Sequence, residues 1–204
     1  VGAPENAMLC AVGGQGVTTI TNAARDPEIA ALQDFLNTMG AHVRGAGGSV
    51  ITIVGGRPLH GGAFAVMGDR IVAATLLSAA AAAGGRVELS GVDRDHLAPV
   101  LEVLRQAGCR VDTGETFAAL SRDPDRPLLA VPTVRTAPYP GFPTDAQAPV
   151  MAALCTARGS TVFVENLFDS RFRHVEELRR MGADITTEGR VAVVRGVERL
   201  RGAH

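Results

Sequence analysis

Residues 159–166 have the sequence GSTVFVEN, and MGADI follows at 181–185, so that Gly182 lies 23 residues after Gly159. The chain contains this pattern two more times with nearly the same spacing. The other copies are GRVEL (85–89) with AGCRV (107–111), and GVTTITN (16–22) with MGAHV (39–43). The copies begin 69 and 74 residues apart. A motif that recurs with constant internal spacing indicates one structural unit used three times.

Each copy predicts two helices around a strand. An alanine-rich stretch comes first and is apolar nearly all round, which is typical of a helix buried on every side; these stretches are 4–12, 69–83 and 145–157. A strand with alternating apolar and polar residues follows, at 17–21, 87–90 and 162–165. An amphipathic helix comes next, and it is clearest where apolar residues recur at Leu97, Val100, Leu101 and Leu104. Each such helix is followed by a glycine in the C-cap position, namely Gly40, Gly108 or Gly182.

Further strands complete the unit. Two short strands close each copy, as at 183–187 and 190–195, and another precedes the buried helix at 63–67 and 129–136. The unit therefore reads βαβαββ, and the fold class is α/β with three units present. A helix that is apolar all round must be covered by sheets, so we expect helices inside and sheets outside. The first copy lacks its leading strand and the chain begins Val-Gly-Ala, so we expect it to be part of a longer one.

Composition excludes several classes of protein. The 204 residues carry a formal net charge of −1, which gives no reason to expect a nucleic-acid or membrane partner. The cysteines (Cys10, Cys109 and Cys155) and the five histidines show no metal-ligand spacing, so we expect no metal, no disulfide and a cytoplasmic location. All three cysteines are predicted to be small core residues, two of them in the buried helices. No signal peptide or membrane-spanning run is visible.

Three segments give the chain its family resemblance. They are NAARDPEI (22–29), RTAPYPGFPTD (135–145) and ELRRMGAD (177–184). Together with the repeats, they resemble the enolpyruvyl transferase family, and within it the UDP-N-acetylglucosamine 1-carboxyvinyltransferases. The PGFPTD run argues against the shikimate-type enzymes. The resemblance implies an inside-out α/β barrel of two domains with three units each. Residues 1–62 would be the last unit of the first domain, and residues 63–204 two units of the second.

The resemblance also implies a reaction and its partners. An enolpyruvyl group would pass from phosphoenolpyruvate to the 3-hydroxyl of UDP-N-acetylglucosamine with release of phosphate, the first committed step of peptidoglycan synthesis. No cofactor is implied. The family's Lys-Asn pair and its mobile loop would precede Val1, and a further unit would follow His204. We therefore expect these 204 residues alone to lack activity and to need the remainder of the enzyme chain.

The resemblance assigns roles to individual residues. Asp145 matches the aspartate proposed as base for the acceptor hydroxyl. Thr144, the residue before it, is assigned to substrate binding. Arg171 matches an arginine that faces the phosphoenolpyruvate carboxylate, which suits a planar guanidinium. Leu167 matches a residue whose backbone contacts the acceptor. Val1 and Gly2 match the end of a diphosphate-binding segment, where a helix N-terminus offers unpaired N–H groups.

The sequence also allows a structural role for Asp145 and two other functions for the chain. Asp145 precedes a predicted helix as Asp69 does in the second copy, so it also fits a simple N-cap. Val72, Pro149 and Ser170 depart from the residues usual in the family, and they leave open a different nucleotide acceptor. A non-catalytic nucleotide-binding remnant is the other alternative. Pro149 is tolerable only close to a helix N-terminus.

Overall fold

The computed structural model describes residues 1–203, and the chain divides into two compact units. The first unit takes Val1–Met67, and the second takes Gly68–Ala137 and the residues from Gly141 onward. Each unit has its own cluster of buried apolar side chains. Within the described part of the chain, no helix has the length and apolar character needed to cross a membrane.

The three sequence repeats share one sheet topology, which confirms the predicted repetition. In every copy the last strand is central and pairs antiparallel with both others. The sheets are β1–β3–β2 (Val17–Thr21, Val50–Val54, His42–Arg44), β4–β6–β5 (Gly85–Ser90, Phe117–Arg122, Arg110–Thr113) and β8–β10–β9 (Ser160–Val164, Val191–Arg195, Asp184–Glu188). The strands predicted after the buried helices therefore form, with ends shifted by at most two residues.

The three C-cap glycines are confirmed. Gly40, Gly108 and Gly182 have φ of 94°, 92° and 93°, a left-handed conformation that glycine adopts without steric cost. In each copy the N–H of the third residue after the helix, which directly follows the glycine, bonds back to the last turn of the helix at 3.0 Å. These bonds join Ala41 to Leu36, Cys109 to Leu104 and Ala183 to Leu178. The Schellman motif thus ends the amphipathic helix of every copy.

In the first unit, α1 (Gly2–Gly13) and α2 (Pro27–Thr38) pack beside the three-stranded sheet. α1 buries Met8 and Val12, whereas Leu9 is 51% exposed and Cys10 is exposed. For the described residues, the predictions of burial on every side of this helix and of a core position for Cys10 are therefore wrong, because the sheet and α2 cover only part of the helix surface.

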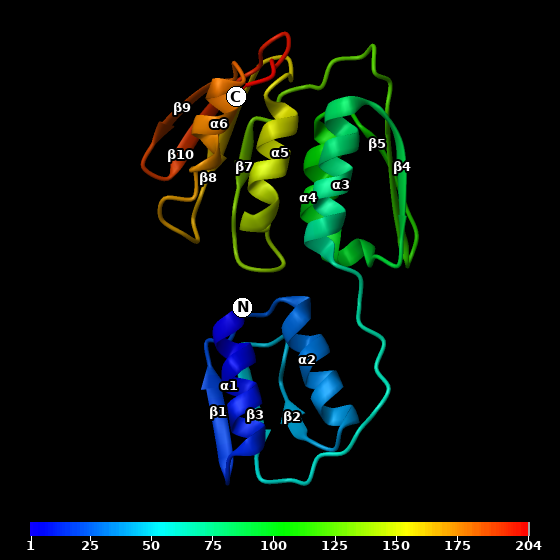
Figure 1. Ribbon diagram of the computed structural model, residues 1–204, viewed down its shortest axis with the longest axis vertical. Coiled ribbons are helices and arrows are strands. Elements are labelled where there is room, and N and C mark those ends of the chain that lie inside the picture. Colours follow the sequence, from blue (N-terminus) through cyan, green and yellow to red (C-terminus); the bar gives the residue numbers. More distant parts are fainter. Residues whose placement is uncertain (204) are drawn as a thin grey trace. The chain divides into compact units, whose positions relative to one another are not determined.

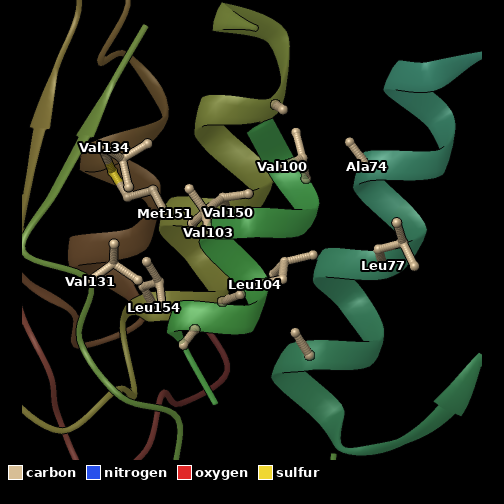
Figure 2. Packing of buried hydrophobic residues seen from close by; sticks show 14 of the residues in the cluster. Ala74, Leu77, Val100, Val103, Leu104, Val131, Val134, Val150, Met151 and Leu154 are labelled. Atoms are coloured by element: carbon tan, nitrogen blue, oxygen red, sulfur yellow. The ribbon is translucent and has the colours of Figure 1, made fainter. Parts of the chain in front are cut away.

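The second unit is built around three helices, shown in Figures 1 and 2: α3 (Arg70–Ala83), α4 (Arg94–Gln106) and α5 (Gln147–Leu154). The predicted stripe of α4 is confirmed, because Leu97, Val100, Leu101 and Leu104 are all at most 2% exposed. α3 packs against both other helices through small residues and Leu77 (Figure 2). Its opposite face carries Val72 and Leu76, which are 54% and 46% exposed, so α3 also is not buried all round.

Of the two strands predicted before the buried helices, one forms in part and the other does not form. In the third copy, β7 (Thr133–Arg135) runs parallel to β8, and α5 makes the crossover between them. Residues 129–132 add only an isolated bridge from Leu129 to Arg158. Residues 63–67 form no strand, so that prediction is wrong. A strand needs a neighbour for its ladder, whereas Phe64 packs its ring on Phe35 of α2.

Candidate active site

A closed loop leads from β7 to the candidate site. Ala137 N–H donates to the Phe142 carbonyl at 3.1 Å, and the Phe142 side chain is buried. The chain then makes the single 3₁₀ turn η1 (Thr144–Ala146) before α5 begins. Asp145 is the middle residue of this turn, which leaves its carboxylate 56% exposed and directed away from the core.

Asp145 is not the helix N-cap that its sequence position allowed. No side chain caps η1 or α5, whereas Asp69 accepts from the N–H groups of Ile71 and Val72 at 2.7 and 3.0 Å. The cap interpretation therefore holds for Asp69 and is wrong for Asp145. The inserted 3₁₀ turn moves Asp145 away from the free N–H groups of α5.

The structure brings Asp145 and Arg171 together. Arg171 Nη2 donates a hydrogen bond to Asp145 Oδ1, and the arginine side chain is 40% exposed. The guanidinium carbon also lies 5.5 Å from the centre of the Phe168 ring, within range of a cation–π contact. A carboxylate and a guanidinium 26 residues apart in sequence thus form one exposed, charged site.

The segment that carries Arg171 is held at several points. Asn166 N–H donates to Thr136 Oγ1 and its side-chain amide donates to the Thr136 carbonyl, both at 2.9 Å. Arg190 donates from Nε and Nη2 to Asp169 Oδ1 at 2.9 and 2.6 Å. These contacts tie the segment to the end of β7 and to the β9–β10 turn.

Glu165 lies beneath the site and is 1% exposed. Burial raises its pKa, but hydrogen bonds from Leu167, Thr144, Phe168 and Thr136 outweigh burial and hold the pKa below its ordinary value. Glu165 is therefore ionised at neutral pH. Sequence reasoning missed this residue, although a signal existed: Thr161, Phe163 and Glu165 alternate on the buried face of β8 and its continuation. A carboxylate at an inward position must have partners.

The remaining predicted residues lie in two places. Thr144 is buried, and its hydroxyl donates to Glu165 Oε2 at 2.9 Å. Leu167 N–H donates to Glu165 Oε1 at 2.9 Å, so this donor is already used within the protein. Val1 and Gly2 belong to the first unit, where Gly2 begins α1.

One of the departures from the family pattern has a backbone explanation. Pro149 is the third residue of α5, where the helix uses no N–H, so its missing donor costs nothing. Ser170 has φ of 55°, a conformation in which asparagine is enriched over serine, so the backbone does not explain the serine at this position. Val72 lies on the exposed face of α3.

The backbone of Ser170 gives a stability prediction. A left-handed conformation costs an ordinary residue about 1–2 kcal/mol, and asparagine relieves part of this cost. We expect Ser170→Asn to raise the free energy of unfolding by up to about 1 kcal/mol. Ser170→Val should lower it, because a β-branched side chain fits this conformation worst. Urea unfolding measures both, and a Val variant as stable as the parent would contradict the prediction.

His174, the first residue of α6 (His174–Arg180), gives a pH prediction. Burial lowers its pKa most, the Arg171 charge lowers it further, and a hydrogen bond with the Arg171 backbone raises it in part. A lowered pKa favours the neutral ring, so its contribution to stability is complete above about pH 6.5, the unfolded-state value. The contribution is lost as pH falls toward the folded-state pKa.

We therefore expect the melting temperature to fall between pH 7.5 and pH 5.5, and to fall less in His174→Gln. Thermal unfolding at the two pH values gives the comparison. Equal falls in the parent and the variant would contradict the lowered pKa.

The comparisons with known proteins agree with this architecture. The model of the family "EPSP synthase (3-phosphoshikimate 1-carboxyvinyltransferase)" matches residues 1–204. The chain is 50% identical over 204 residues to UDP-N-acetylglucosamine 1-carboxyvinyltransferase 1 of Symbiobacterium thermophilum. It is 49% identical over 205 residues to UDP-N-acetylglucosamine 1-carboxyvinyltransferase of Novosphingobium aromaticivorans. These matches cover 100% of the chain but 45% and 47% of the relatives, so it spans about half their length.

Solved structures share the fold. The enolpyruvyl transferase NikO from Streptomyces tendae superposes with a TM-score of 0.78 at 24% identity, over 96% of this chain and 46% of that one. EPSP synthase from Acinetobacter baumannii superposes with a TM-score of 0.63 at 25% identity, over 94% and 45%. Since the family model matches the whole chain and the folds agree, this chain belongs to the EPSP synthase family of enolpyruvyl transferases.

Proposed function

We propose that this chain supplies part of the active site of an enzyme that transfers enolpyruvyl from phosphoenolpyruvate to the 3-hydroxyl of UDP-N-acetylglucosamine. The observation that carries the proposal is the pairing of Arg171 with Asp145, the last residue of the PGFPTD run. The named activity of relatives that are 46–50% identical over the whole chain supports the choice of substrates. The product would enter peptidoglycan synthesis.

The proposed chemistry is addition followed by elimination. The methylene carbon of phosphoenolpyruvate gains a proton, and the acceptor oxygen attacks the neighbouring carbon as its own proton leaves. The adduct then loses phosphate and a proton from the methyl carbon, which restores the double bond in the product ether. Asp145 would take the hydroxyl proton as general base. Its exposed carboxylate is reachable by an incoming sugar.

Arg171 would hold the donor carboxylate. The guanidinium already binds a carboxylate in this structure, that of Asp145. A donor carboxylate can replace it, since a planar guanidinium offers parallel N–H groups to both. That exchange would also free Asp145 to meet the acceptor hydroxyl. Thr144 and the Leu167 carbonyl would border the acceptor.

The domain assignment extends the same proposal. Residues 1–62 would form the last unit of one domain, and residues 63–204 two units of another, in an inside-out barrel. Val1 and Gly2 would contribute N–H groups of α1 to the UDP diphosphate, because the first N–H groups of a helix are unpaired and its dipole attracts anions.

A different nucleotide acceptor is the second candidate, motivated by the departures from the family pattern. Two of these departures argue less strongly for it, because Pro149 lies where α5 uses no N–H and Val72 lies on an exposed helix face. A non-catalytic nucleotide-binding remnant is the third candidate.

A panel of acceptors separates the candidates. The full-length protein is incubated with phosphoenolpyruvate and, in turn, UDP-N-acetylglucosamine, other UDP-sugars or shikimate 3-phosphate. Phosphate release and the mass of the product are measured. We expect turnover with UDP-N-acetylglucosamine and a product heavier by one enolpyruvyl group. Turnover with another acceptor alone would favour the second candidate, and no turnover with any acceptor would favour the remnant.

A further inference from the structure

The two oxygens of Glu165 hold different segments of the site. Oε1 accepts from the N–H groups of Leu167 and Phe168 at 2.9 and 3.1 Å. Oε2 accepts from Thr144 Oγ1 at 2.9 Å and from Gln147 Nε2 at 3.2 Å. One oxygen therefore holds the segment that leads to Arg171, and the other holds the turn that contains Asp145.

Because these side chains are buried, each of these hydrogen bonds is needed. Glu165, Thr144 and Gln147 are 1%, 8% and 1% exposed, so water cannot replace a lost partner freely. An apolar side chain at position 165 would leave buried donors without acceptors, and each unpaired donor costs more than an ordinary hydrogen bond gains. An ionised carboxylate is the one side chain that offers acceptor sites to all of these donors at once.

We propose that Glu165 is a positioning residue, which sets the distance between the Asp145 turn and the Arg171 segment through its two oxygens. The inference rests on the proposed function of Asp145 and Arg171. Glu165 touches neither reacting group, and it acts by fixing the backbone on both sides of them. We call the hydrogen bonds that Glu165 accepts from these two segments the bridge. A displacement of about 1 Å between catalytic groups can cost about 100-fold in rate, so loss of the bridge should lower the rate measurably.

Gln147 makes a discriminating variant possible. Its Oε1 is buried and has no hydrogen-bond partner among the described residues. In Glu165→Gln, the new carbonyl can keep the Leu167 and Phe168 N–H groups. The new amide can donate to Gln147 Oε1 once the Gln147 amide turns over, and to Thr144 Oγ1, since a hydroxyl can accept as well as donate. The bridge thus survives this substitution but is removed in Glu165→Ala, and in Glu165→Asp it is too short to reach both segments.

The experiment uses these three variants of the full-length protein, with Glu188→Ala at an exposed glutamate of β9 as the matched control. Amide hydrogen exchange at Leu167 and Phe168 is measured with the kinetics of phosphate release, at a temperature where each variant is folded. In Glu165→Ala we expect faster exchange at both amides and a fall in kcat of about 100-fold, with a smaller change in acceptor KM. Glu165→Gln should keep kcat within about tenfold of the parent.

Each outcome decides the proposal. Parent-like exchange and kcat in Glu165→Ala would overturn it, and so would a Gln variant as impaired as the Ala variant. If Glu165→Ala does not fold, Glu165→Asp takes its place, and parent-like behaviour of that variant overturns the proposal. A parent protein that transfers no enolpyruvyl would refute the proposed function instead. The exchange measurement would still test the bridge.

Discussion

Asp145→Asn in the full-length protein is expected to lower kcat by about 10²- to 10⁴-fold, the usual contribution of a general base. Asparagine has nearly the same shape and can still accept a hydrogen bond from the acceptor hydroxyl, but it cannot take up the proton. Acceptor KM should therefore change less than kcat. Steady-state kinetics with both substrates varied gives the two values separately.

The fold should survive this substitution. Asp145 caps neither η1 nor α5, and its ion pair with Arg171 is exposed, where such pairs are worth about 0–1 kcal/mol. Asp69→Asn is the matched control, because Asp69 holds the corresponding sequence position in the second repeat and asparagine is an equally good cap. The control should keep full activity. A parent-like kcat in Asp145→Asn would show that Asp145 is not the base.

Arg171→Ala should lower kcat/KM for phosphoenolpyruvate by about 30- to 5000-fold. This range corresponds to about 2–5 kcal/mol, the usual cost of removing one partner from a desolvated charge pair. Acceptor binding should weaken much less, because the guanidinium is assigned to the donor. Kinetics in phosphoenolpyruvate and binding of UDP-N-acetylglucosamine by calorimetry separate the two effects.

Two further variants control for charge and geometry. Arg173→Ala removes an exposed arginine two residues away and should leave the donor kinetics unchanged. Arg171→Lys keeps the charge but loses the planar pair of N–H groups, so it should recover only part of the loss. If Arg171→Ala and Arg173→Ala behave alike, the specific role of Arg171 is refuted.

Much of the fold follows from local sequence patterns. The strands that follow the buried helices, the buried stripe of α4 and the glycines at 40, 108 and 182 depend on residues close together in the chain, and the structure confirms them. The strand predicted at 63–67 is wrong because a strand also depends on a distant partner. The burial of α1 was overestimated for a related reason: alanine content does not determine how many faces are covered.

The candidate site was predictable only in part. The resemblance identified Asp145 and Arg171, but not their pairing, since a 3₁₀ turn that displaces Asp145 from the cap position leaves no clear mark in the sequence. Glu165 could have been found from the alternation of β8. What the sequence could not show is that the two oxygens of this one buried carboxylate serve two segments.

The most direct test of the account is a crystal structure of the full-length protein with UDP-N-acetylglucosamine and phosphoenolpyruvate bound, using an inactive variant to keep both substrates intact. Arg171 is expected to bind the donor carboxylate, with the hydrogen bond between Arg171 and Asp145 broken. The residue at position 145 should lie within about 3.2 Å of the sugar 3-hydroxyl, the reach of a general base. Substrates bound away from both residues, with the Asp145–Arg171 contact intact, would contradict the central claim.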